Sequence, residues 1–139
     1  MLVQFALGSA MILLTVINHG LFSAAGVALL THSRFRDRKP TTHIKAAFAL
    51  ALFVLWMFLS TILASFAWAY LYVWVGALTS FSESIYFSMV TMTTLGYGDI
   101  VLDKSWHLLS AIEGANGSFL LGWSTALTFY AMQRVYDDR

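Results

Sequence analysis

The sequence predicts an all-α membrane protein with three transmembrane helices and one short helix that enters the membrane without crossing it. Hydrophobic residues make up 59% of the 139 residues, and charged residues make up only 11%. A soluble domain carries about 25% charged residues, so this chain lacks the charge to cover a soluble surface. The composition therefore argues against a solvated enzyme, a nucleic-acid-binding module and a disordered tail.

Three long stretches that are nearly free of charge define the predicted transmembrane helices. Asp, Glu, Lys and Arg are absent from residues 1–33 and 46–82, and Glu113 is the only such residue in 105–133. Each stretch exceeds the roughly 20 apolar residues that a spanning helix needs. We predict these helices at about 4–31, 44–77 and 105–134. Four aromatic residues near the end of the second helix are expected to form an interfacial belt: Trp68, Tyr70, Tyr72 and Trp74.

The basic residues predict how the helices are oriented. Seven of them lie in the loop after the first helix, at its edge or near the C-terminus: Arg34, Arg36, Arg38, Lys39, Lys45, Arg134 and Arg139. Lys104 alone lies between the second and third helices. The positive-inside rule then places the loop and the C-terminus in the cytoplasm, with the N-terminus and residues 78–104 outside. We read the three loop arginines as topogenic charge, because a voltage sensor places arginines at every third position of a span.

Residues 78–104 are too few to cross the membrane twice and too apolar to form a free loop. Ser80 or Ser82 can cap a short helix, and Glu83 favours its first turn. A helix that runs to about Thr93 is roughly 18 Å long and cannot span the bilayer. Non-helical backbone after it, at membrane depth, is tolerated only inside protein or along a water-filled path.

Residues 93–99, Thr-Thr-Leu-Gly-Tyr-Gly-Asp, resemble the selectivity filter of potassium channels, and residues 86–92 resemble their pore helix. The order of outer helix, pore helix, filter and inner helix covers residues 44–136. The chain is therefore similar to small bacterial potassium channels of the pore-loop superfamily, with an extra helix before the pore domain. This divides it into a helix and basic loop at 1–43 and a pore domain at 44–139. Leu95 replaces the usual Val or Ile, and the proline that often follows Asp99 is missing.

The resemblance implies a potassium-selective homotetramer in the cell (inner) membrane, which conducts passively and is not an enzyme. The backbone carbonyls of Thr94, Leu95, Gly96 and Tyr97, with the Thr94 hydroxyl, would bind the permeant K⁺ ions. Gly96 and Gly98 make the alternating left- and right-handed backbone of such a filter cheap. The alternatives are a chance Gly-Tyr-Gly turn, a non-conducting or accessory channel-like subunit, and a cation channel of relaxed selectivity.

The same resemblance implies which residues support the filter. We expect Tyr86, in place of the commoner Trp, to donate a hydrogen bond to Asp99. Val90 occupies the position of a bracing glutamate that it cannot replace. Five residues are assigned to this support: Asp99, Tyr86, Val90, Thr93 and Glu113.

Glu113 is the only acid in the predicted spans, and an acid inside a membrane is costly unless it has a partner. Its depth matches Ser88 and Thr91 of the pore helix, so we expect a bond to the pore helix of its own or a neighbouring subunit, with Asn116 as a helper. The alternative is that Glu113 reaches up to the outer water.

The third helix is expected to line the lower pore. Ser110, Gly114, Ser118, Gly122 and Ala126 form a stripe of small residues that favours close helix packing, although such residues are frequent in membrane helices. Gly117 is interpreted either as a gating hinge or as a packing glycine. Phe119, Trp123, Leu127 and Tyr130 lie on another face, where they could gate the pore by dewetting or could face another helix or lipid.

Cofactors and other partners are not expected beyond K⁺, the bilayer and further copies of the chain. There are no cysteines, and the net charge of +1 gives no basis for binding nucleic acid. The four histidines, at positions 19, 32, 43 and 107, do not have metal-site spacing. We interpret His19, beside Asn18 in the first helix, as a packing contact between helices rather than as a ligand.

Overall fold

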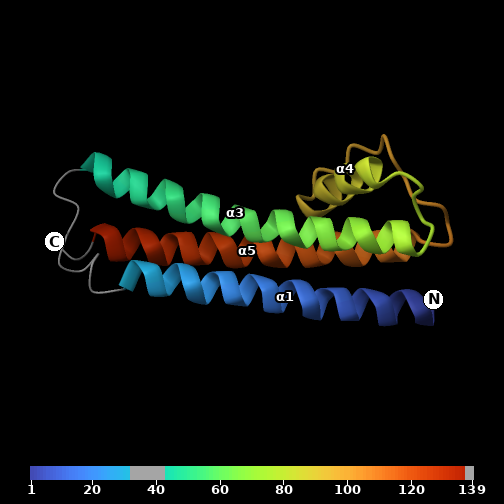
Figure 1. The fold of residues 1–139 in the computed structure, drawn as a ribbon, viewed down its shortest axis with the longest axis horizontal. Helices are drawn as coiled ribbons and strands as arrows, with labels where there is room; N and C mark the ends of the chain where they lie inside the picture. The colour runs from blue at the N-terminus through green and yellow to red at the C-terminus, as the bar shows by residue number, and fades with distance from the viewer. Residues whose placement is uncertain (32–42, 137–139) are drawn as a thin grey trace.

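The regular elements of the structure, a computed structural model that describes residues 1–31 and 43–136, are all α-helices. The basic cluster at 34–39 and Arg139 lie outside the described residues. The helices are α1 (Leu2–Thr31), α3 (His43–Trp74), α4 (Phe81–Met92) and α5 (His107–Tyr136). Figure 1 shows α1, α3 and α5 side by side along the long axis, with α4 beside α3 at the end where α1 begins.

The helix bounds agree with the sequence-based ones to within three residues. The largest difference is at the end of α3, which stops at Trp74 because the chain turns at Gly76. Gly76 has a φ of +70°, and the N–H of Ala77 donates to the carbonyl of Tyr72 at 2.9 Å. This left-handed glycine cap satisfies the last carbonyls of the helix and ends it.

Two of the described helices, α1 and α3, are long and apolar enough to cross a membrane. α5 has 30 residues, the same length as α1, but it does not reach the same apolar character. The reason lies in its polar side chains, among them Glu113, Asn116 and Ser124, which turn toward the other helices. The prediction that α5 also spans the membrane therefore stays a prediction.

The main core lies at the α4 end of the bundle, where α3, α4 and α5 meet. Trp68 and Tyr72 are fully buried there, together with Met92 and Leu109. The predicted interfacial belt is therefore wrong for Trp68 and Tyr72. These two residues share one face of α3 because they are four positions apart, and only Tyr70 and Trp74, each 68% exposed, face outward.

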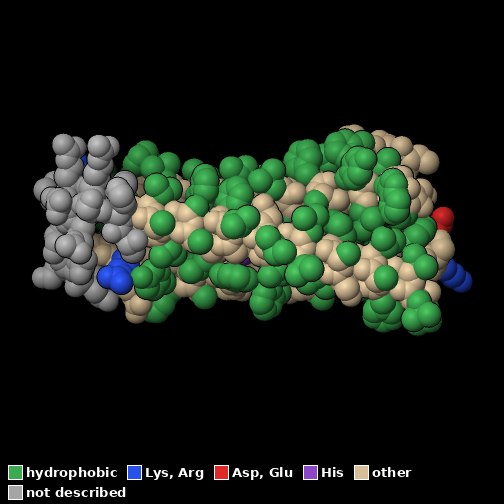
Figure 2. All heavy atoms as spheres, turned by 60° about the horizontal axis from the view of Figure 1, so that its bottom comes forward, with side chains coloured by type: hydrophobic (Ala, Val, Ile, Leu, Met, Phe, Trp, Pro, Cys, Tyr) green, Lys and Arg blue, Asp and Glu red, His purple; other side chains and the backbone are tan. Residues whose placement is uncertain are grey.

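The outside of the molecule is apolar along most of its length. In the view of Figure 2, hydrophobic side chains cover the middle, whereas coloured charged side chains appear only toward the two ends. Lys45 lies in the first turn of α3 and Arg134 in the last turn of α5, so both lie at the end opposite α4, while Lys104 precedes α5 at the α4 end. The positive-inside argument places Lys45 and Arg134 on one side of the membrane and Lys104 on the other, and these residues lie at opposite ends of the bundle.

Candidate functional site

The short helix α4 is built by local capping. Ser80 has an extended backbone, and its side chain accepts the N–H of Glu83 at 3.5 Å. Of the two serines considered from sequence, Ser80 is the cap. Glu83 lies in the first turn, where a negative charge favours the positive end of the helix dipole. Twelve residues at 1.5 Å each give a helix of roughly 18 Å.

The other end of α4 holds the segment that follows it. The Thr93 hydroxyl donates to the carbonyl of Met89 at 2.6 Å. The carbonyl of Val90 accepts the N–H of Leu95 at 3.0 Å and that of Gly96 at 3.4 Å. Val90 therefore supports the predicted filter through its main chain, a role that its apolar side chain gave no reason to expect.

The backbone from Thr94 to Gly98 alternates in handedness. Thr94, Gly96 and Gly98 have φ values of +61°, +56° and +77°, whereas Leu95 and Tyr97 between them are not in the positive-φ region. The glycines were expected to take this conformation, but Thr94 was not. A residue with a Cβ pays roughly 1–2 kcal/mol to adopt it, and such strain collects at functional sites.

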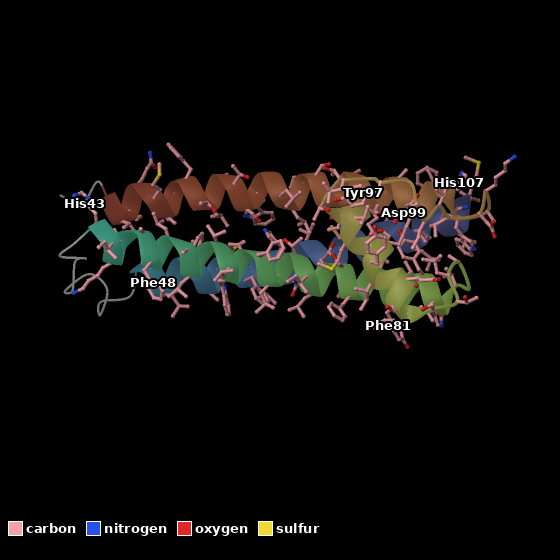
Figure 3. The ribbon with its side chains drawn as sticks, turned by 90° about the horizontal axis from the view of Figure 1, so that it is seen from above. His43, Phe48, Phe81, Tyr97, Asp99 and His107 are labelled. Carbon is pink, nitrogen blue, oxygen red and sulfur yellow. The ribbon has the colours of Figure 1, made fainter. Side chains whose placement is uncertain are left out.

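The predicted filter lies on the surface of the single chain. Residues 94–99 are exposed, with Leu95 at 59% and Tyr97 at 67%. Figure 3 shows Tyr97 and Asp99 in the half of the molecule that holds His107, far from His43. Within one chain the side chain of Tyr97 is therefore largely uncovered.

The hydrogen bond expected between Tyr86 and Asp99 is present. The Tyr86 hydroxyl on α4 donates to Oδ2 of Asp99 at 2.6 Å. This bond stabilises the ionised acid and holds the pKa of Asp99 below its usual value. It ties the end of the predicted filter back to the first half of α4.

Glu113 is fully buried and bonded to two other helices. The Ser88 hydroxyl of α4 donates to its Oε1, and the Tyr72 hydroxyl of α3 donates to its Oε2 at 2.6 Å. The expected bond to the pore-helix segment is thus confirmed at Ser88, and the alternative of reaching outer water is wrong. We call Tyr72, Ser88 and Glu113 the carboxyl bridge, because one carboxyl group joins α3, α4 and α5.

Neither the role of Tyr72 nor the partner of Asn116 was predicted correctly from sequence. Tyr72 was predicted as an interfacial aromatic; its spacing of four residues from Trp68 indicates a shared helix face but not that this face is buried. Asn116 does not help Glu113; its Nδ2 donates to Thr15 Oγ1 of α1 at 2.7 Å. Asn116 lies three residues beyond Glu113, so its side chain leaves α5 in a different direction. It faces α1, whereas Glu113 faces α3 and α4.

Much of the chain matches the model of a known protein family. A family model described as "Ion channel" matches residues 51–134, which is more than half of the chain. The chain belongs to the ion channel family. No curated protein and no solved structure matches this ion channel. The matched residues contain most of α3, all of α4, the segment 94–98 with its alternating backbone, and nearly all of α5.

Gly117 of the channel is explained by packing. A Cβ on Gly117 would lie 2.0 Å from the carbonyl oxygen of Met92, the last residue of α4. The missing side chain thus lets the end of α4 rest on α5. Because α5 is unbroken from His107 to Tyr136, the structure supports the packing interpretation, and the hinge stays a prediction.

The small-residue stripe of α5 begins against α4 and continues on an open face. Ser110 and Gly114 are half-buried, and a Cβ on Gly114 would be 3.9 Å from the Thr91 carbonyl. Ser118, Gly122 and Ala126 are exposed. In the isolated channel chain the lower stripe is therefore free for packing against further protein.

Of the four bulky residues considered as a gate, Trp123 and Leu127 pack against other helices, Phe119 is exposed, and Tyr130 is bonded within α5. The Trp123 ring lies edge-on to His19 of α1, with centroids 5.5 Å apart, and Leu127 packs on the cluster of Phe53 and Met57. These positions remove Trp123 and Leu127 from the open face. Phe119 is 60% exposed and remains a gate candidate. Tyr130 is held by Arg134, whose Nε donates to its hydroxyl at 3.0 Å.

The described part of the channel, 1–31 and 43–136, contains no group of three or more His, Asp or Glu that could hold a metal ion. Binding of K⁺ by the carbonyls of residues 94–97 and by the Thr94 hydroxyl stays a prediction. His19 is buried among other helices, as expected of a packing contact.

Proposed function

We propose that this ion channel conducts K⁺ passively and selectively, through a filter that residues 94–98 of four identical copies form together. The observation that carries the proposal is the left-handed backbone at Thr94, Gly96 and Gly98, every second residue of the signature. Alternating handedness turns successive carbonyls toward the same side. A column of such oxygens can replace the water of a K⁺ ion.

The surface position of the segment supports a homotetramer. One loop cannot surround an ion, and residues 94–99 are exposed in the single chain. Four loops around one axis would enclose the ions and cover Tyr97, which is 67% exposed. The proposed filter support then consists of Tyr86, Val90, Thr93, Asp99 and Glu113.

The three long helices have different open faces. Bulky apolar side chains are exposed on α1 and α3, for example Leu14, Leu21 and Phe58, as lipid contact requires. α5 exposes a set of small and hydroxyl side chains, Ala111, Ala115, Ser118, Gly122 and Thr125, beside the bulky Phe119, Phe129 and Met132. The small and hydroxyl set supports α5 as the span next to the pore, with α1 and α3 as spans toward lipid.

In this arrangement α4 is the re-entrant pore helix, and its C-terminal end, the negative end of the dipole, points toward the cation path. The N-terminus and α4 lie outside, and the C-terminus lies in the cytoplasm, in the inner membrane of a bacterial-type cell. The helix α1 is the addition to the two-helix plan.

Flux through the purified protein tests the proposal. The full chain is reconstituted in lipid vesicles, and the efflux of K⁺, Na⁺ and Cs⁺ is measured against vesicles without protein. We expect K⁺ efflux that exceeds Na⁺ efflux by about tenfold or more, a difference of about 1.4 kcal/mol. Equal K⁺ and Na⁺ efflux would show a cation channel of relaxed selectivity. Absence of all efflux would favour a non-conducting or accessory subunit, in which exposed Phe119 blocks the path.

A further inference from the structure

Three helices meet at His19, at the middle of the bundle. His19 is fully buried on α1. Its Nδ1 lies 3.0 Å from Ser60 Oγ of α3, and its Nε2 lies 3.1 Å from Ser124 Oγ of α5. The ring of Trp123 on α5 packs edge-on against the imidazole at 5.5 Å. We call His19, Ser60 and Ser124 the histidine junction.

The protons of the histidine junction can be assigned one by one. The Ser124 hydroxyl donates to the carbonyl of Leu120 at 2.9 Å, so its oxygen is free to accept from His19 Nε2. Asn18 Nδ2 donates to Ser60 Oγ at 3.0 Å, which leaves the Ser60 proton to be donated to His19 Nδ1. One proton on Nε2 and none on Nδ1 therefore satisfies every group, and this is the neutral imidazole.

A second proton on the imidazole would break this pattern. Nδ1 would become a donor, and the Ser60 hydroxyl would lose its acceptor. A positive charge would also be buried among groups that are not anionic. The histidine junction, one of several ties between α1, α3 and α5, thus depends on the charge of one residue.

No charged side chain of the described helices packed around His19 faces it. The groups that face it are Ser60 from α3 and Trp123 and Ser124 from α5. Along α5, Tyr130 is roughly 9 Å of helix rise from Ser124, and Glu113 is roughly 16 Å away. On α3, Tyr72 is roughly 18 Å of helix rise from Ser60. Within the described residues α1 itself carries no Asp, Glu, Lys or Arg.

We propose that His19 is a positioning residue for the inner helix: neutral His19 holds α5 against α1 and α3, and its protonation releases α5 and changes K⁺ conduction. The inference rests on the proposed function for its effect on conduction. It also gives the additional helix α1 a role, because α1 supplies the imidazole that reaches α5.

Ser124 also lines a groove of about 480 Å³ between α3 and α5, most of whose lining is apolar. Thr125 and Thr128 line it as well, and it extends to Met132 near the end of α5. The groove leads toward the end of the molecule opposite α4. In the proposal, a proton reaches His19 from this side, past Ser124.

K⁺ efflux from vesicles tests the proposal when it is measured between about pH 8 and about pH 5, a range that brackets histidine titration. We expect wild-type efflux to change by about fivefold or more, the ratio that one lost hydrogen bond produces. His19→Gln, which keeps one donor and one acceptor at every pH, should make the profile flat. His107→Gln is the matched control on a histidine outside the junction and should keep the wild-type profile.

A second measurement does not depend on conduction. A protonated imidazole quenches a neighbouring indole, so the tryptophan fluorescence of wild-type protein should fall in acid. Both Trp123→Phe and His19→Gln should remove this fall. If His19→Gln does not assemble, Ser124→Ala replaces it, because it removes one bond of the junction and should weaken the pH dependence of efflux.

The outcomes separate the two proposals. A conducting wild type with a flat pH profile, or a His19→Gln variant with the wild-type profile, overturns the role of His19. Absence of efflux at every pH defeats the proposed function, and the fluorescence then decides whether His19 is protonated beside Trp123. A fluorescence titration that His19→Gln leaves unchanged overturns the inference in that case as well.

Discussion

The hydroxyl of Tyr72 on α3 donates a 2.6 Å hydrogen bond to the buried carboxyl of Glu113 on α5, which also accepts from Ser88 of α4. The phenol ring of Tyr72 packs edge-on against Phe87 of α4, with centroids 5.2 Å apart. The position of α4 is therefore held by the carboxyl bridge and by an aromatic contact beside it. In the proposed channel this positions the filter, because the filter follows α4 directly.

Substitutions at Glu113 should separate hydrogen bonding from charge. Glu113→Gln keeps an acceptor for Tyr72, and its amide can donate to Ser88 once the Ser88 hydroxyl turns to accept, so we expect tetramer stability close to that of wild type. Glu113→Leu leaves two buried hydroxyls unpaired, at a cost of about 1–3 kcal/mol for each. The stability of both Glu113 variants is measured by thermal dissociation of the purified oligomer. Tyr72→Phe removes one of the two hydrogen bonds, so its stability should lie between those of the two Glu113 variants. A Glu113→Leu protein as stable and as conductive as wild type would refute the supporting role.

The glycines of the proposed filter, Gly96 and Gly98, should tolerate no side chain. Gly96→Ala or Gly98→Ala forces a Cβ into a left-handed backbone, at roughly 1–2 kcal/mol each. We expect K⁺ efflux to be lost while membrane insertion is kept. Gly76→Ala is the matched control, because Gly76 has a φ of +70° and equally open surroundings but lies outside the filter. It should lower stability and keep selectivity. Normal K⁺ selectivity in either filter variant would contradict the filter assignment.

The Tyr86–Asp99 bond should set the response of the filter to acid. The bond lowers the pKa of Asp99, so its stabilisation is present above the ordinary pKa of about 4 and is lost as the pH falls through the lowered value. Tyr86→Phe removes the donor, so the pKa of Asp99 should rise and the acid-induced loss of efflux should move to higher pH.

Asp99→Asn should alter how fast the filter stops conducting, measured in current recordings. The pKa of Asp99 itself can be followed by carboxyl NMR in wild type and Tyr86→Phe. Asp103→Asn, a change in an exposed acid of the same loop, should leave the acid response as it is in wild type. An unchanged pKa of Asp99 in Tyr86→Phe would argue against the bond.

Gly117→Ala should displace the end of α4. Its Cβ would be 2.0 Å from the backbone oxygen of Met92, and backbone cannot move aside as a side chain can. Overpacking of this kind costs about 1–3 kcal/mol. We expect a lower dissociation temperature together with reduced K⁺ efflux. Gly20→Ala on α1 is the control, since its Cβ would make an ordinary 3.8 Å contact with Trp123. Equal stability of the two variants would show that α4 does not rest on Gly117.

The long helices, the capped short helix and the positive φ of Gly96 and Gly98 were predictable from the sequence. These features depend on local properties: uncharged stretches, Ser80 as a cap, and glycine at positions that need positive φ. The bond between Tyr86 and Asp99 was also predicted, but from the resemblance to potassium channels rather than from the two residues alone.

Only the tertiary structure decided which helix faces meet. Asn116 bonds Thr15 rather than helping Glu113, Tyr72 is a buried donor rather than an interfacial aromatic, and Trp123 packs on α1. Helical periodicity shows which residues share a face, but the rotation of each helix is set by packing against its neighbours. In a chain that is apolar on nearly every face, hydrophobicity cannot choose that rotation, and the few buried polar pairs and close glycine contacts do.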